Sequence, residues 1–463
     1  MKQRVLTLLI ALQLSACSLT PVLMLPAAPV PKNYPLTQSI DSSTSAVQLD
    51  WQVVFPERRL QRLIELALTN NRDLRLAALN VEAVKAQFGV QRAAQLPSID
   101  VATGVVRQRS NATDIGTQFS FAFGMNAFEV DLFGRARASS DASFERYLAS
   151  EQGRKAVQIS LIAAVADAYC VELVAQEQLQ VAKQTLLDWQ KSLDLARGLK
   201  AANQVSGLDI AQAEGQVASA EADLQGRTRS VAQARNALRL LLGVELPDDL
   251  PVAPLLEQLP RYALQSGLPS ELLINRPDIL QAENNLRAAN ADIGVVRAAF
   301  FPRLSLTSSF GYSSPEMRNL FGNERSVWNF VPQITVPIFS AGKLRSELRL
   351  AEVRKSSAVA EYERAIQIAF REVSDGLAGR ETYAPQIEAQ QSVVRSAEKR
   401  LELLNLRYRA GIESRLELLD SQRQMHAARL SLLELRRAEM SNLIALYKAL
   451  GGGASPIEMH FKK

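Results

Sequence analysis

Few residues of this 463-residue chain carry groups suited to covalent or metal chemistry. It has two cysteines, Cys17 and Cys170, and two histidines, His426 and His460. A metal site or a catalytic dyad needs several such groups at a characteristic spacing, and neither histidine has a candidate ligand near it. The sequence contains no P-loop, H-E-x-x-H, C-x-x-C or G-x-S-x-G motif. We therefore expect no enzyme activity, no metal site and no cofactor, and we interpret His426 and Cys170 as packed side chains.

Cys17 lies in a sequence that predicts its modification. Residues 1–16 carry Lys2 and Arg4, then a short apolar stretch, and end in L-S-A directly before the cysteine. The stretch is too short to span a membrane, which takes about 20 apolar residues. The pattern is that of a bacterial lipoprotein signal peptide. We predict that Cys17 receives a covalent lipid and becomes the first mature residue, and the serine after it favours the outer membrane.

Composition indicates a folded chain with a mixed-charge surface. Apolar residues make up 47% of the chain, and the net charge of +5 is modest. Acidic and basic residues alternate along helical segments, so we expect no nucleic-acid partner. Residues 17–50 contain five prolines among small polar residues, which predicts an extended tether between the lipid and the folded body.

Four strands are expected near residues 98–107, 118–130, 303–312 and 327–338. In the second, apolar and polar residues alternate with a period of two over a length sufficient to cross a bilayer as a tilted strand, which takes about 9–11 residues. Such an alternation predicts one lipid-facing side and one polar side. The side chains that we expect to face lipid are Phe119, Phe121, Phe123, Phe310, Trp328 and Phe330.

Long helical patterns follow the strands, at residues 135–199, 208–242, 342–409 and 414–449. Leucines seven residues apart in the first of them (Leu179, Leu186 and Leu193) are typical of a coiled coil. An apolar stretch at residues 156–175 contains charged residues, so we interpret it as a packed helix face and not as a membrane span.

The second half of the chain repeats the first. R-A-A-x-x-P at 92–97 recurs at 297–302, a shift of 297 − 92 = 205. Two long copies indicate pseudo-symmetry, because a solenoid needs three or more short units. The sequence predicts a first repeat at 51–246, a connector at 247–270, a second repeat at 271–450 and a C-terminal tail at 451–463.

The strand count predicts an oligomer. Four strands cannot close a barrel, and an open sheet edge within lipid leaves backbone groups unpaired. Two copies would give eight strands with a filled interior, whereas three give twelve and leave a lumen. We therefore expect an α+β membrane protein whose copies join to close the sheet.

These features resemble the TolC-like outer-membrane factors, in particular their OprM-like lipoprotein branch. The resemblance covers nearly everything after the signal. It rests on L-S-A-C at 14–17, the duplicated R-A-A-x-x-P, V-P-I-F-S-A-G at 336–342, R-Y-R-A-G-I-E-S-R-L-E-L-L-D-S-Q at 407–422 and L-Y-K-A-L-G-G-G at 446–453.

The resemblance implies a homotrimer with a 12-stranded transmembrane β-barrel, four strands per chain, that is continuous with a long periplasmic α-helical coiled-coil barrel. Such a trimer would be a passive exit duct in the outer membrane of a Gram-negative bacterium, lipid-anchored and extending into the periplasm. Its partners would be outer-membrane lipid, a periplasmic membrane-fusion adaptor and an inner-membrane pump of the resistance-nodulation-division type. The cargo would be small toxic molecules, either drugs or metal ions. An exit duct for type I protein secretion and a non-channel coiled-coil envelope protein are the alternatives.

Two positions are expected where the helices turn at the end far from the strands. Asn203 and Gly411 coincide at a shift of 411 − 203 = 208, and both residue types tolerate the left-handed conformation of a helix end. Helix hairpins at these points would form a periplasmic tip.

The resemblance also implies which residues close that tip. Leu416 and Asp420 match its narrowest rings, and Glu417 is a further acidic position near them. Tyr408 and Arg409, with Asp209 from the first hairpin, match polar links that hold the hairpins shut. Like charges on such a ring would raise the pKa of some of the carboxyl groups.

Overall fold

The computed structural model describes residues 18–31, 34, 50–109, 115–247, 249–259, 275–322, 324–410 and 412–452. The signal peptide, Cys17, Gly411, His460 and nearly all of the C-terminal tail lie outside the described residues. The chain divides into two compact units. The first contains Met1–Ala28, Leu79–Gly153 and Leu280–Ala365, and the second contains Pro29–Ala78, Arg154–Ile279 and Ile366–Lys463.

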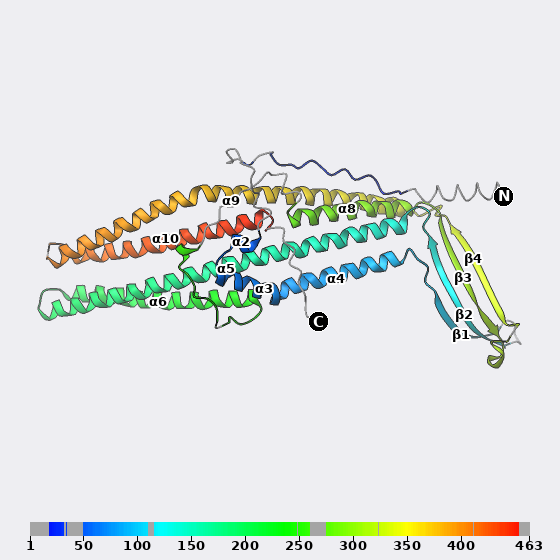
Figure 1. The fold of residues 1–463 in the computed structure, drawn as a ribbon, viewed down its shortest axis with the longest axis horizontal. Helices are drawn as coiled ribbons and strands as arrows, with labels where there is room; N and C mark the ends of the chain where they lie inside the picture. The colour runs from blue at the N-terminus through cyan, green and yellow to red at the C-terminus, as the bar shows by residue number, and fades with distance from the viewer. Residues whose placement is uncertain are drawn as a thin grey trace. The chain divides into compact units, whose positions relative to one another are not determined.

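The first unit holds one antiparallel sheet with the strand order β1-β2-β3-β4 (Figure 1). The strands are β1 (Asp100–Arg109), β2 (Ile115–Val130), β3 (Arg303–Ser314) and β4 (Ser326–Thr335). The expectation of four strands per chain is confirmed. The two edge strands, β1 and β4, each pair with one neighbour in the described part of the chain.

The fourth strand ends earlier than expected. The sequence predicts that it reaches residue 338, but Val336 and Ile338 lie beyond its last residue, Thr335. Thr335 pairs with Arg303, the first residue of β3, so within the described chain β4 has no partner beyond it, and Pro337 has no N–H to donate to a ladder there.

One face of the sheet gathers the large apolar side chains. Phe123 pairs with Phe310, and Phe310 pairs with Trp328, so the three form a row across β2, β3 and β4. Phe330 lies two residues after Trp328, hence on the same face. Exposure is 56% for Phe310 and 76% for Trp328, so nothing in the described chain covers this row. All six residues expected to face lipid share this face: Phe119, Phe121, Phe123, Phe310, Trp328 and Phe330.

The helices reproduce the repeat. Helices α4 (Arg72–Ala93) and α8 (Pro277–Ala298) are related by a shift of 277 − 72 = 205. Helices α5 (Arg135–Ala201) and α9 (Lys343–Arg409) have 67 residues each and a shift of 343 − 135 = 208. They are followed by α6 (Gly207–Leu242) and α10 (Arg415–Ala449). The four long helices therefore begin and end within two residues of the expected positions.

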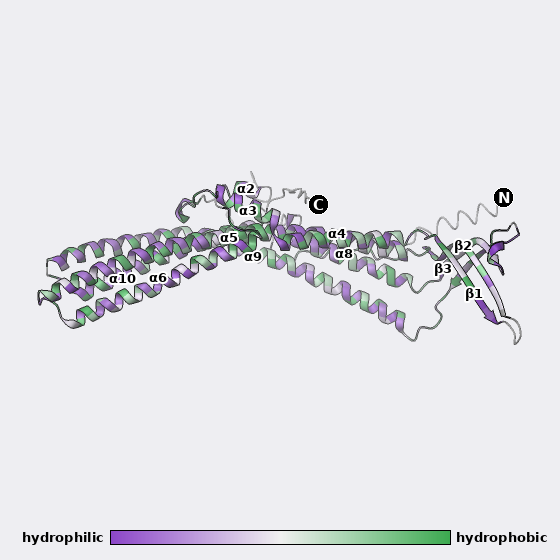
Figure 2. Cartoon of the chain, turned by 90° about the horizontal axis from the view of Figure 1, so that it is seen from below, coloured by the Kyte–Doolittle hydropathy of each residue, from purple (hydrophilic) through white to green (hydrophobic). Residues whose placement is uncertain are grey.

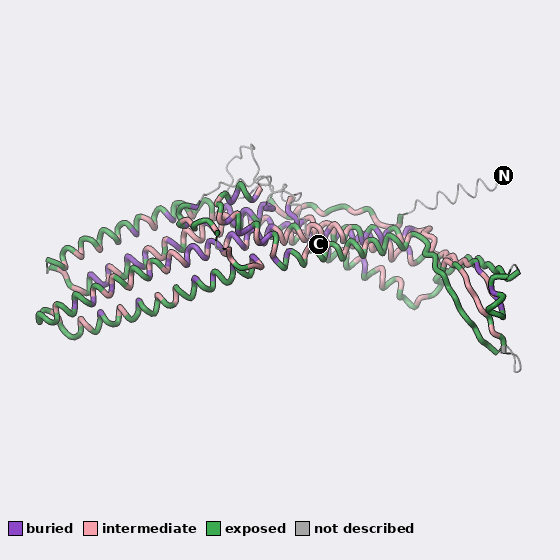
Figure 3. The backbone as a smooth tube through the Cα atoms, turned by 60° about the horizontal axis from the view of Figure 1, so that its bottom comes forward, coloured by how far each residue is buried: buried purple, intermediate pink, exposed green. Residues whose placement is uncertain are grey.

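The core of the second unit lies between its long helices (Figures 2 and 3). Trp189 of α5 is 6% exposed and packs with Ala220 of α6 and Leu419 of α10. Helix α5 contains an 18-residue window apolar enough to cross a membrane, but 61% of that window is buried within the protein. Tyr169 and Cys170 are buried in the stretch that we interpreted as a packed helix face.

The described parts of the tether and of the connector make contacts that the sequence did not predict. The chain before α2 (Trp51–Val54) has no helix or strand where it is described, yet buried Tyr34 stacks on Phe370 with ring centroids 5.1 Å apart. In the connector, the short helix η2 (Leu256–Gln258) buries Leu256, whose N–H donates to Glu177 Oε1 at 2.6 Å. In the described parts of these segments, single side chains therefore dock although prolines disfavour long helices and strands.

Two pseudo-equivalent junctions close the repeats. Helix α3 (Arg58–Asn70) is followed by Asn71, whose Nδ2 donates to Leu241 O near the end of α6 at 2.8 Å. In the second repeat, Arg276 takes the place of Asn71 (276 − 71 = 205), and its Nη1 donates to Ala449 O at the end of α10 at 3.0 Å. Each junction thus uses a side chain to bond a carbonyl that a helix end leaves free.

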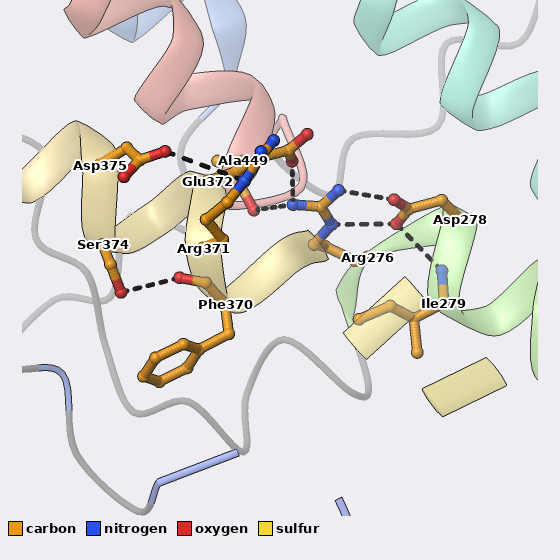
Figure 4. Close-up of polar contacts among 9 residues, drawn as sticks. All are labelled: Arg276, Asp278, Ile279, Phe370, Arg371, Glu372, Ser374, Asp375 and Ala449. Carbon is orange, nitrogen blue, oxygen red and sulfur yellow. Dashed lines mark hydrogen bonds and ion pairs between the residues drawn. The ribbon is translucent and has the colours of Figure 1, made fainter. Parts of the chain in front are cut away.

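Arg276 carries a larger set of contacts than Asn71 (Figure 4). Its guanidinium forms a fork with Asp278, through Nε to Oδ1 at 2.9 Å and Nη2 to Oδ2 at 2.5 Å. Nη1 also donates to Glu372 Oε2 of α9 at 2.7 Å. The arginine side chain is only 5% exposed. One buried cation therefore joins the start of α8 to α9 and α10.

Candidate functional site

The turn between α5 and α6 has the left-handed residue that the sequence predicts. Asn203 has φ +54°. Its N–H donates to Lys200 O, and the N–H of Gln204 donates to Leu199 O, both at 2.9 Å. This is the Schellman pattern of a helix end. The N–H of Ile412 donates to Arg407 O at 3.0 Å, so the α9–α10 turn repeats the outer bond of the pattern at the 208 shift.

Asp209 caps the start of α6. Its carboxylate accepts from Ser206 N at 2.9 Å and from Ser206 Oγ at 2.7 Å, and its own N–H donates back to Ser206 Oγ at 3.3 Å. The side-chain hydrogen bond from Ser206 is the main reason why the pKa of Asp209 is lowered. In the described chain Asp209 forms no hydrogen bond with Tyr408 or Arg409. The expected links between these residues are therefore not made within one protomer.

The second hairpin has the equivalent cap. Ser414 Oγ accepts from Glu417 N at 3.3 Å, and Glu417 stands where Asp209 stands in the first repeat (417 − 209 = 208). The Glu417 carboxylate accepts a hydrogen bond from Arg400 Nη2 at 3.4 Å. Leu416 beside it is 68% exposed.

Asp420 is neutralised within its own helix. Arg423 Nη2 donates to Oδ1 at 2.7 Å, and Gln424 Nε2 donates to Oδ2 at 2.5 Å. The hydrogen bond from Arg423 lowers the pKa of the Asp420 carboxyl. Within one protomer a cation one turn away therefore lowers this pKa, whereas the raised pKa expected from like charges concerns three copies on one ring and stays a prediction.

Tyr408 and Arg409 lie near Arg415, a residue that the sequence did not indicate. They line a pocket of about 300 Å³ with Arg415, at the first turn of α10. Arg415 Nη2 donates to Ser192 O of α5 at 3.3 Å, and its charge contributes to the lowered pKa of Asp209. Arg415 therefore joins the two hairpins of one protomer. No motif marks it, since only the fold brings residues 192 and 415 together.

A second hollow lies along α9 and α10. It is an open groove of about 830 Å³. Arg407 pairs with Glu413 at 3.0 Å across its end. The charged residues that line it are Arg395, Lys399, Arg400, Arg407, Glu413 and Glu417, so its net charge is positive.

His426 and Cys170 are packed side chains, as expected. His426 is 8% exposed and lies 2.9 Å from Thr185 Oγ1 through Nδ1, and burial lowers its pKa. Burial raises the pKa of the Cys170 thiol to about 12. Among the described residues, no group of three His, Cys, Asp or Glu side chains is arranged to hold a metal ion.

Known proteins resemble this chain over nearly its whole length. The sequence profile of the outer membrane efflux protein family matches residues 63–244 and 268–452, one segment in each half of the chain. The toluene efflux pump outer membrane protein TtgF of Pseudomonas putida is 41% identical over 98% of this chain and 97% of its own. The solvent efflux pump outer membrane protein SrpC of Pseudomonas putida is 42% identical over 98% and 99%.

Among solved structures, the open state of the MtrE outer membrane channel of Neisseria gonorrhoeae is 38% identical and superimposes with a TM-score of 0.88. The match covers 94% of this chain and 98% of MtrE. Sequence and fold agree over nearly the whole length, so this chain belongs to the outer membrane efflux protein family, whose members form outer-membrane channels of efflux pumps.

Proposed function

We propose that three copies of this chain close into a 12-stranded barrel that serves as the exit duct of a tripartite efflux pump. The observation that carries the proposal is a sheet that, among the described residues, has two unpaired edges and one uncovered apolar face. Pairing β1 of one copy with β4 of the next would satisfy both edges, as lipid requires. The apolar row of Phe123, Phe310 and Trp328 would then face lipid, and the polar face would line the lumen.

The cargo that we propose is small hydrophobic molecules, such as organic solvents and lipophilic antibiotics. TtgF and SrpC are named for toluene and solvent efflux. We take the duct to be passive, so the driving force has to come from an inner-membrane pump, which we take to be of the resistance-nodulation-division type. We place the adaptor on the basic groove along α9 and α10, since its arginines and lysine suit acidic groups on a partner helix.

Deletion of the gene tests the cargo. The deletion strain should become sensitive to toluene and to lipophilic antibiotics, and expression of the wild-type chain should restore resistance. The purified protein should also conduct ions in planar bilayers. Unchanged solvent and drug tolerance together with the loss of a secreted protein would favour the type I secretion alternative.

Cys17 is proposed as the acylated first residue of the mature chain. Mass spectrometry of the mature N-terminus should show a diacylglycerol on this cysteine. The barrel is a second membrane attachment, so Cys17→Ser with an ordinary cleavage signal should still assemble while its efflux activity falls. An unmodified mature chain that begins elsewhere would contradict this assignment.

We propose that the tip residues Tyr408, Arg409, Leu416, Glu417 and Asp420, together with Asp209, form the periplasmic gate. The gate predicts an unusual effect of Arg423. Its pairing lowers the pKa of Asp420, so the pair is intact at neutral pH and is lost only as the pH falls through that lowered value. Arg423→Ala would leave Asp420 charged and unpaired, and a negative ring attracts cations.

Cation selectivity, measured as the reversal potential in a salt gradient, should therefore rise in Arg423→Ala and fall again below about pH 4, where a free aspartate protonates. Arg395→Ala removes an arginine of the groove along α9 and α10 that is not paired with Asp420, and it should leave the selectivity unchanged. Equal reversal potentials for both variants would show that Asp420 does not face the conducting path.

A further inference from the structure

Residues 19–21 of the N-terminal segment lie against α8, and both belong to the first unit. Pro21 O accepts a hydrogen bond from Asn290 Nδ2 at 2.7 Å, and Leu19 O accepts from Arg297 Nη1 at 3.5 Å. Between these two contacts, Thr20 lies over Gly294. Asn290, Gly294 and Arg297 are spaced four and three residues apart, so they occupy one face of the helix. We call these three residues the α8 groove.

Gly294 is required for this close approach. A Cβ atom at this position would overlap Thr20 Oγ1 and lie 3.1 Å from Thr20 Cα, so a side chain would take the place of the segment. Asn290 is 4% exposed, although asparagine is a polar residue. Its Nδ2 is bonded because the segment is there, whereas its buried Oδ1 has no hydrogen-bond partner among the described residues.

The first repeat provides an internal comparison. Gly89 of α4 corresponds to Gly294 (294 − 89 = 205), yet a Cβ added at Gly89 would meet nothing within 4 Å. Lys85 and Arg92 stand where α8 has Asn290 and Arg297. The glycine is present in both repeats, but in the described chain only α8 holds a docked segment. Docking is therefore a property of α8 and not of the repeat.

We propose that the α8 groove is a binding site for the chain's own N-terminal segment and that it fixes where the acylated Cys17 enters the lipid. This inference rests on the proposed acylation. Cys17 precedes Leu19 by two residues, so it can lie no more than about 7 Å from a docked position. Helix α8 ends at Ala298 and β3 begins at Arg303, so the acyl chains would enter the bilayer beside the start of this strand.

Cross-linking tests the docking in the full-length outer-membrane protein. Leu19→Cys with Arg297→Cys should be joined by a short bifunctional thiol-reactive reagent, because Arg297 Nη1 lies 3.5 Å from Leu19 O and these substitutions leave Gly294 without a side chain. Leu19→Cys with Arg92→Cys is the matched control, since Arg92 corresponds to Arg297 in the first repeat (297 − 92 = 205), and it should not be joined. Cys170 does not compete, since burial raises the pKa of its thiol to about 12. Absence of the cross-link at Arg297, or equal cross-linking at Arg92, would overturn the docking site.

Spin labels test the fixed position of the anchor. Val22 is 89% exposed, and a nitroxide on Val22→Cys reports distances between the copies of the oligomer. The distance distribution should be narrow in the parent and in Gly89→Val, and roughly twofold broader in Gly294→Val, where the segment becomes a flexible chain. Asn290→Ala should also broaden the distance distribution, because it removes the hydrogen bond to Pro21 O without adding a larger side chain.

Equal widths in all of these variants would overturn the inference. If the nitroxide reagent labels Cys17, this residue has a free thiol and is not acylated. That outcome would overturn the acylation and the placement of the anchor. The cross-linking experiment would still show whether the segment docks on α8.

Discussion

Phe330→Lys is expected to prevent assembly of the channel in the outer membrane. Phe330 lies in the middle of β4, on the apolar face, and is 56% exposed. A lysine on the lipid side of a barrel strand costs about 2–4 kcal/mol near the bilayer midplane. In a trimer the substitution occurs three times, so the total cost is about 6–12 kcal/mol, comparable with the whole stability of a folded domain.

Val331→Lys is the matched control. Val331 is also apolar and 50% exposed, but it is the next residue along β4 and so lies on the opposite face. A lysine there would enter the aqueous lumen, and the trimer should form as in the wild type. The trimer fraction in outer-membrane extracts, measured by native mass spectrometry, compares the two variants. If Val331→Lys fails and Phe330→Lys assembles, the faces are reversed, and equal behaviour would contradict a sheet with one lipid side.

The sequence predicts this fold well because its elements are long and their periods are clear. Sixty-seven helical residues contain many turns of the heptad pattern, so errors at the ends hardly matter. The strands were found because their aromatic side chains alternate over lengths that few soluble strands reach. The end of β4 is less predictable, because Val336 and Ile338 continue the apolar alternation beyond the point where the partner strand β3 begins.

The sequence predicts the tip less well, since its contacts join residues that are far apart. The left-handed Asn203 was predicted because the conformation depends on residue type. The cap formed by Asp209 was also readable, because Ser206 precedes it by three residues in the pattern of a capping box. The Asp420–Arg423 pair is a local signal of the same kind. Arg415 has no such signal, because its partner Ser192 O lies 223 residues away.

The junction at Arg276 should be the most sensitive point of the second unit. Arg276→Met would leave the carboxylates of Asp278 and Glu372 and the carbonyl of Ala449 without their common donor. Breaking a buried ion pair from one side costs about 3–5 kcal/mol. We expect the lower end of this range, since the side chains of Asp278 and Glu372 are 41% and 32% exposed and water can reach both of them.

The repeat again supplies the comparison. Asn71→Ala removes the bond to Leu241 O and the cap on Leu74 N, both of them neutral, and should cost about 1–2 kcal/mol. Arg276→Lys keeps the charge but cannot form the fork, so it should fall between the wild type and Arg276→Met. Thermal denaturation in detergent ranks the variants by their midpoints.

A double-mutant cycle separates the ion pair from simple loss of packing. Glu372→Gln should lower the midpoint in the wild-type background, where it weakens a charged hydrogen bond. In the Arg276→Met background it should lower the midpoint less, or raise it, because it removes a carboxylate that has lost its cation. Additive effects of the two substitutions would mean that Arg276 stabilises the junction through its packed side chain and its bond to Ala449 O, and not through Glu372.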